Sequence, residues 1–136
     1  MAREQRTRPV NAAQARSYVA KADEYLAAAT SELDAGRSIA ATSLAIHAAI
    51  NAADAVTGVR VGRRAAGQDH DGVLKLLLEA GQDGADVERN LGRLLPLKTK
   101  AEYEPDDIPR TEATRAVERA GRCVAIALRL MSEGGQ

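Results

Sequence analysis

The fold is decided by residues 37 to 58, which read Arg37-Ser-Ile-Ala-Ala-Thr-Ser-Leu-Ala-Ile-His-Ala-Ala-Ile-Asn-Ala-Ala-Asp-Ala-Val-Thr-Gly58. Alanine has the highest helix propensity of all residues, and a helix built from this stretch is apolar on nearly every side. Such a helix belongs in an interior, with other helices packed on several of its faces. The stretch therefore predicts the central helix of a helical domain.

A narrow polar stripe interrupts this apolar helix. At 100° per residue, a face about 80° wide collects Ser43, His47, Asn51 and Asp54. Buried polar side chains are unfavourable unless they have partners, so the stripe must face water, another polar cluster or a ligand. Two interpretations stay open, a satisfied buried network or dimer groove and a functional site.

The composition favours one soluble all-α domain. The 136 residues suffice for a single core, and three tyrosines are the only aromatic residues, so no alternating β-branched and aromatic run predicts a sheet. Lys plus Arg equals Asp plus Glu at 19 each, so any electrostatic partner must be argued from local patches. The lone Cys123 fits a reducing cytoplasm. Without a signal-like N-terminus or a long uninterrupted apolar run, we expect a cytoplasmic protein.

Helical periodicity predicts four more helices around the central one. The first begins at Asn11, a plausible N-cap, and the third opens at Asp69-His70-Asp71. A fourth follows Gly84 and is interrupted by Pro96, and the last begins near Thr111. We expect an all-α, five-helix up-and-down bundle over residues 11–133, preceded by a disordered basic arm at residues 1–10.

A short basic segment follows the central helix and carries Arg60, Arg63 and Arg64. Its glycines fit neither the dinucleotide fingerprint nor the phosphate-binding loop, and no His-Glu-x-x-His pattern occurs, so we expect neither a cofactor nor a metal. Contact with phosphate and a solvated turn are equally good interpretations of the three arginines.

The order of these features resembles the HEPN domain family over roughly residues 14–131. The resemblance is carried by Arg37-x-x-x-Ala41, His47-Ala-Ala-Ile-Asn-Ala-Ala-Asp54, Gln68-Asp-His-Asp-Gly-Val73 and Lys98-Thr-Lys-Ala-Glu-Tyr103. It is closest to small stand-alone actinobacterial members. It implies a dimeric helical bundle linked to RNA cleavage or binding, toxin–antitoxin pairs and defence systems, in which a nucleotidyltransferase-like protein is a possible cognate partner.

The resemblance also implies where catalysis would occur, and this chain departs from that pattern. Catalytically active members carry an arginine followed, after four to six residues, by a histidine, and they act without a metal at the dimer cleft. The corresponding segment here, Lys98–Tyr103, has no histidine. Arg64 and His70 are separated by five residues, but they straddle a loop ahead of the third helix, so we interpret this match as coincidence.

We therefore expect a non-catalytic, HEPN-like homodimer that binds RNA or a protein through one polar pocket. In that pocket the stripe on the central helix would face His70, Lys98 or Tyr103. The alternative is a metal-independent endoribonuclease that uses His70 or His47 with Arg64 or Lys98. The full set of expected binding residues is Ser43, His47, Asn51, Asp54, Arg60, Arg63, Arg64, Asp69, His70, Lys98, Lys100 and Tyr103.

Overall fold

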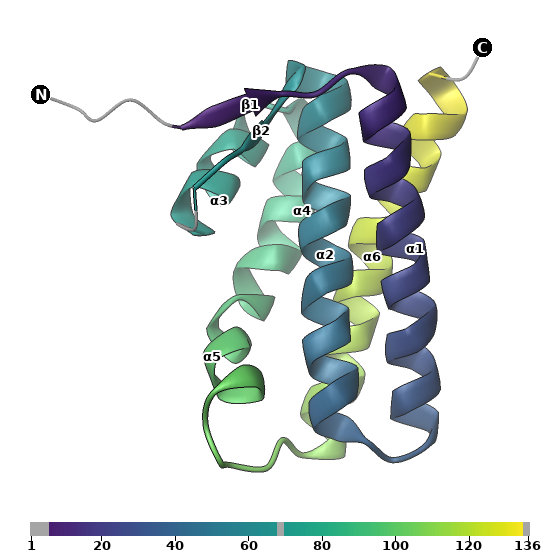
Figure 1. Cartoon of the computed structure of the whole chain (residues 1–136), viewed down its shortest axis with the longest axis vertical. Helices are drawn as coiled ribbons and strands as arrows, with labels where there is room; N and C mark the ends of the chain where they lie inside the picture. Colours follow the sequence, from purple (N-terminus) through teal and green to yellow (C-terminus); the bar gives the residue numbers. More distant parts are fainter. Residues whose placement is uncertain (1–5, 68–69, 135–136) are drawn as a thin grey trace, which may run out of the picture.

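The computed structural model describes residues 6–67 and 70–134, which form a helical bundle with one short two-stranded ribbon (Figure 1). The prediction of a mostly helical bundle is confirmed. The described residues contain six helices in place of the expected five, because Pro96 starts a helix of its own. The elements are β1 (Thr7–Pro9), α1 (Ala12–Asp34), α2 (Ser38–Val61), β2 (Arg63–Ala65), α3 (His70–Leu78), α4 (Gly81–Leu94), α5 (Pro96–Glu102) and α6 (Arg110–Gly134).

Helix α2 occupies the centre, as its apolar sequence predicts. It packs along α1 and α6 on one side and against α4 on another, while α3, α5 and the ribbon flank it (Figure 1). Ile46 and Val56 are fully buried, and α3 and α4 contribute Leu77 and Leu91 to the same core. Among the described residues, α2 alone is long and apolar enough to cross a membrane by length and composition, and 56% of its most apolar stretch is buried inside the bundle.

Local side-chain chemistry sets the ends of α1. The carboxamide oxygen of Asn11 accepts a hydrogen bond from the backbone of Gln14 at 2.8 Å, and the Gln14 side chain accepts one from the backbone of Asn11 at 2.9 Å. This reciprocal capping box confirms Asn11 as the N-cap. After α1 ends, Gly36 adopts φ of +82°, a left-handed conformation that turns the chain back along α2.

The expectation of a disordered N-terminal arm is wrong for residues 7–10. Strand β1 pairs antiparallel with β2, and Thr7 lies opposite Ala65. Val10 is buried where it meets α2, and Gly58 permits this approach because a Cβ there would lie 2.6 Å from Cγ1 of Val10. The burial of Val10 and the pairing of β1 with β2 thus order a segment that its composition alone predicts to be disordered. Residues 1–5 lie outside the described part.

Two helix boundaries differ from the prediction. Helix α2 continues past Gly58 to Val61 and ends where Gly62 takes φ of +74°. Helix α4 begins at Gly81, ahead of the predicted start after Gly84, so Asp83 lies in its first turn. Gly58 lies within α2 and Gly84 within α4, so neither of them ends a helix. Positive φ occurs instead at Gly62, which follows α2, and at Gly81, where α4 begins after α3.

Candidate functional site: a polar seam along α2

The polar stripe of α2 is met by side chains from α1, β2 and α5, and α3 contacts α5 beside it. The pairwise contacts run from the middle of α2 towards its C-terminal end, along the side covered by α5, α3 and β2. We call this group the polar seam; its members are Tyr18 and Tyr25 of α1, His47, Asn51 and Asp54 of α2, Arg64 of β2, His70 of α3, and Lys98 and Glu102 of α5.

His47 is held from two sides. Its Nε2 atom lies 3.3 Å from Oε1 of Glu102, and its ring stacks on Tyr25 with centroids 5.5 Å apart. The imidazole remains 42% exposed, so one part of the ring faces solvent. One turn along the helix, the amide of Asn51 donates to the backbone carbonyl of His47 at 2.8 Å. The histidine is therefore positioned by the fold while part of its ring stays accessible to a ligand.

Asp54 lies deeper in the seam. Burial raises its pKa from 3.8 to about 7, and the positive charge of Arg64 works in the opposite direction. The guanidinium of Arg64 donates to the carbonyl of Ala65 at 3.1 Å and lies over the ring of Tyr18 at 5.9 Å from its centroid. A carboxyl group that changes its protonation near neutral pH thus lies beside a cation stacked on an aromatic ring.

The start of α3 meets α5 at the third contact of the seam. Nζ of Lys98 lies 3.4 Å from Nε2 of His70. Lys98 precedes Glu102 by one helical turn, so the two side chains lie on the same face of α5. The fold therefore brings the beginning of α3 against α5, and α5 contacts the stripe of α2 through Glu102. A direct contact of the stripe with His70 or Lys98 stays a prediction.

Several predicted residues lie elsewhere. Ser43 lines a separate shallow groove of about 670 Å³ with Arg37 and Asp107, and Tyr103 is 76% exposed at the end of α5, so neither joins the seam. The expectation that Tyr103 faces the stripe is wrong, because α5 ends one residue earlier. Asp69 lies outside the described residues. The remaining cations form ion pairs: Arg60 with Asp83, Arg63 with Glu79, and Lys100 with Glu112.

The structure adds three seam residues that the sequence did not single out. Tyr18 and Tyr25 lie seven residues apart on one face of α1, a spacing that is equally typical of core positions. Glu102 carried a usable signal, because it follows Lys98 at the i, i+4 spacing. Its pairing with His47 depends on how α5 packs on α2, which the sequence does not reveal.

Metal-dependent or thiol chemistry finds no support in the described residues. They contain no group of three His, Cys, Asp or Glu side chains that could hold a metal ion. Cys123 of α6 is buried against Val87 of α4, and this burial raises its pKa to about 12, which disfavours the nucleophilic thiolate. No protein-family model and no curated protein matches the sequence. The chemistry of the side chains is the remaining guide to function.

Proposed function

We propose that this chain is a non-catalytic, HEPN-like helical domain that binds RNA through the polar seam. The observation that carries the proposal is that two planar nitrogen-bearing side chains each lie against a tyrosine ring: Arg64 on Tyr18, and His47 on Tyr25. Unpaired RNA bases stack on aromatic and guanidinium planes, and cations neutralise the adjacent phosphates. Asn51 adds an amide next to His47, and amides read base edges by hydrogen bonds.

The pairing of the acid–base side chains supports binding without cleavage. His47 interacts with Glu102 and Tyr25, whereas His70 and Lys98 interact with each other. Cleavage of RNA needs a base, an acid and a cation arranged around one phosphate. In the polar seam, His47, His70 and Lys98 interact instead with other side chains of the protein.

A metal-independent endoribonuclease is the second candidate, and one observation favours it. The cation Lys98 and the imidazole of His70 lie 3.4 Å apart, and Asp54 has a pKa of about 7, which suits a general base. These are the side chains that phosphodiester hydrolysis without a metal requires.

RNA incubated with the protein in the presence of EDTA distinguishes the two candidates. We expect the wild type to bind a mixed-sequence single-stranded RNA without cleaving it, and we expect Arg64→Gln with Lys98→Gln to weaken binding roughly tenfold. Cleavage that disappears in His47→Ala or His70→Ala would establish the endoribonuclease and remove the non-catalytic proposal. Failure of the concentrated, folded wild type to bind any RNA would remove both.

We also propose that the protein is a cytoplasmic homodimer that acts in a toxin–antitoxin or defence system, with a nucleotidyltransferase-like protein as its cognate partner. The HEPN resemblance supports this, as does the partly exposed Leu128 on the outer face of α6, which a second copy would cover. Sedimentation velocity should give twice the chain mass at micromolar concentration. A monomer at all concentrations would exclude the homodimer.

A further inference from the structure

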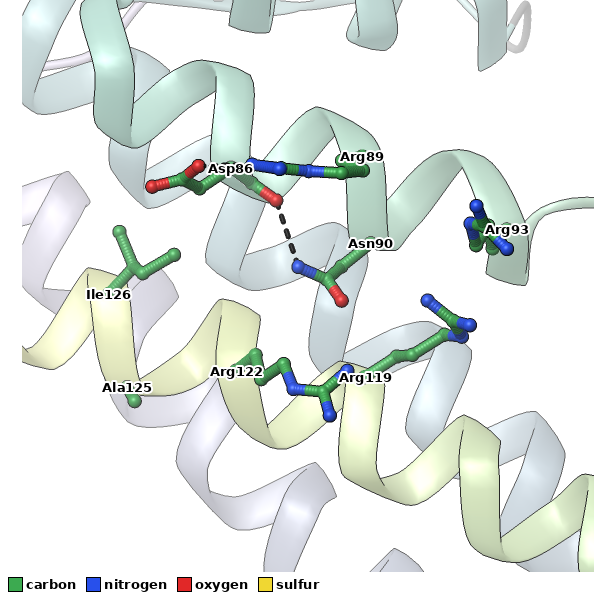
Figure 2. A pocket seen from close by; sticks show the side chains of 8 residues that line it. All are labelled: Asp86, Arg89, Asn90, Arg93, Arg119, Arg122, Ala125 and Ile126. Carbon is green, nitrogen blue, oxygen red and sulfur yellow. Dashed lines mark hydrogen bonds and ion pairs between the residues drawn. The ribbon is translucent and has the colours of Figure 1, made fainter.

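An open groove of about 680 Å³ runs between α4 and α6 (Figure 2), and none of its lining residues belongs to the polar seam. Its polar lining comes from Asp86, Arg89, Asn90 and Arg93 on α4 and from Arg119 and Arg122 on α6. We call these six residues the arginine groove. A second groove of about 440 Å³ shares Arg93 and Arg119 and adds Arg115, so the basic surface continues towards α5.

Helical periodicity aligns these cations into two facing rows. Arg89 and Arg93 are one turn apart on α4, and Arg115, Arg119 and Arg122 follow one face of α6 at the i, i+4 and i, i+3 spacings. The row on α6 spans roughly 10 Å at the rise of an α-helix. Because the positive charge extends along a line, the surface fits an extended anion better than a single one.

Three of the four arginines that line this groove have no acidic partner within the described residues. Asp86 interacts with Arg89 and with Gln82, both on its own helix. Over the described ranges, no acidic side chain forms an ion pair with Arg93, Arg119 or Arg122. The guanidinium groups of Arg93 and Arg119 approach each other from the two helices (Figure 2). Like charges repel at this position unless an anion lies between them.

Four arginines elsewhere in the bundle have acidic partners. Arg37, Arg60, Arg63 and Arg129 each interact with an acidic side chain of the protein. Unpaired cations such as Arg16 and Lys21 also occur singly on the described surface, whereas between α4 and α6 three guanidinium groups without an acidic partner line one groove. Guanidinium groups on two facing helices, three of them without an acidic partner, suit the binding of successive phosphates, since each guanidinium matches two phosphate oxygens.

We propose that the arginine groove binds the phosphate backbone of RNA, while the polar seam contacts the bases. This inference rests on the proposed RNA binding and assigns the backbone to a second surface. A second copy of the chain is a poorer occupant, because a two-fold contact at this surface would place arginine against arginine. Asn90 donates to the backbone carbonyl of Asp86 at 2.9 Å, which leaves its carboxamide oxygen facing the groove as a hydrogen-bond acceptor for a ribose hydroxyl (Figure 2).

The test measures the RNA affinity of three variants by fluorescence anisotropy. The probe is a labelled, mixed-sequence single-stranded RNA, and the KCl concentration is varied. The groove variant is Arg93→Gln, Arg119→Gln and Arg122→Gln. The seam variant is Arg64→Gln with Lys98→Gln. The matched control removes three exposed cations that line neither groove, Arg16→Gln, Lys21→Gln and Lys75→Gln. Circular dichroism melts establish that each variant is folded.

We expect the groove variant to bind RNA at least tenfold more weakly, and the control to bind within about twofold of the wild type. Since each phosphate contact on a single strand contributes about 0.7 to the slope of log K against log salt, the groove variant should lose about 2 from that slope. The seam variant should lose affinity with a smaller change in slope and a change in base preference.

Each remaining outcome overturns the inference. Equal affinities of the groove variant and the control would remove the groove and leave RNA binding at the seam in place. Displacement of the RNA by polyglutamate as effectively as by unlabelled RNA would instead assign the groove to an acidic protein. No RNA binding by the wild type would remove the proposed function together with the groove.

Discussion

Nζ of Lys98 lies 3.4 Å from Nε2 of His70, although 28 positions separate the two residues in sequence. An ammonium group has only donors, so a hydrogen bond between them requires Nε2 to accept. We therefore expect the neutral imidazole of His70 to carry its proton on Nδ1. Nitrogen–proton correlation spectra above neutral pH measure this tautomer directly, and Lys98→Met should restore a mixture. A protonated Nε2 in the neutral ring of the wild type would contradict the contact.

Asp54 makes the stability of the protein depend on pH. Its pKa rises from 3.8 to about 7 on folding because of burial, so between these values the unfolded chain ionises while the folded chain keeps its proton. Stability therefore falls as pH rises through this window and stays low above it. Since one pKa unit corresponds to about 1.4 kcal/mol, the free energy of unfolding of Asp54→Asn should exceed that of the wild type by about 2 to 4 kcal/mol above pH 7.

Urea denaturation between pH 4 and pH 8 measures this difference, which should vanish near pH 4. Asp23→Asn changes an exposed carboxylate on α1 and should follow the wild type throughout. Parallel curves for Asp54→Asn and the wild type over the whole range would show that the carboxyl group titrates normally. Arg64→Gln should increase the dependence, because its charge favours the ionised form of Asp54.

Asp83 joins three helices. Its two carboxylate oxygens bind Arg60 of α2 and Arg129 of α6, and these hydrogen bonds hold the pKa of Asp83 below its usual value of 3.8. A carboxylate whose pKa is lower in the folded state stabilises the fold at pH values above its unfolded-state pKa. This stabilisation is lost as pH falls through the folded-state pKa. We expect Asp83→Asn to lower stability by about 1 to 2 kcal/mol at neutral pH, and by less in acid.

Thermal unfolding of Asp83→Asn beside Asp86→Asn isolates this effect. Asp86 also accepts from an arginine, which likewise lowers its pKa, but its partners Arg89 and Gln82 are on the same helix. Removal of the Asp86 charge should therefore change stability less. Equal losses from the two variants would show that linking α2, α4 and α6 contributes nothing beyond a local contact.

The sequence predicts those features that local rules decide. The apolar run of α2 allows one solution, an interior helix, and the capping box at Asn11 requires only residues three positions apart. The side of α2 that meets α3 and α5 is also predictable, because a polar stripe cannot face an apolar core. His47, Asn51 and Asp54 could thus be placed in one cluster before any partner was known.

Features that depend on packing could not be predicted. Strand β1 forms because Val10 meets Gly58 across 48 positions, and neither residue carries a local signal for that contact. Glu102 reaches His47 only because Pro96 redirects the chain into α5. The arginine rows of α4 and α6 look like two ordinary solvated helix faces until the helices are seen side by side (Figure 2).

Gly84 is required by the close contact between α4 and the end of α3. A Cβ at this position would overlap the carbonyl oxygen of Leu77 and lie 2.6 Å from Cβ of Ala80. Because a backbone oxygen cannot rotate away, the two helices must move apart to admit a methyl group. We expect Gly84→Ala to lower the free energy of unfolding by about 3 kcal/mol, as overpacking of a core does.

Gly121 is the matched control, since it is also a helical glycine but has nothing within 4 Å of the position of a Cβ. Replacement by alanine there gains helix propensity without a clash, so Gly121→Ala should stabilise the protein by up to about 1 kcal/mol. Urea denaturation of the two variants measures effects of opposite sign. If Gly84→Ala were as stable as Gly121→Ala, then α3 and α4 would not be in direct backbone contact. The contact between these helices would then not be what positions His70 of α3 in the seam.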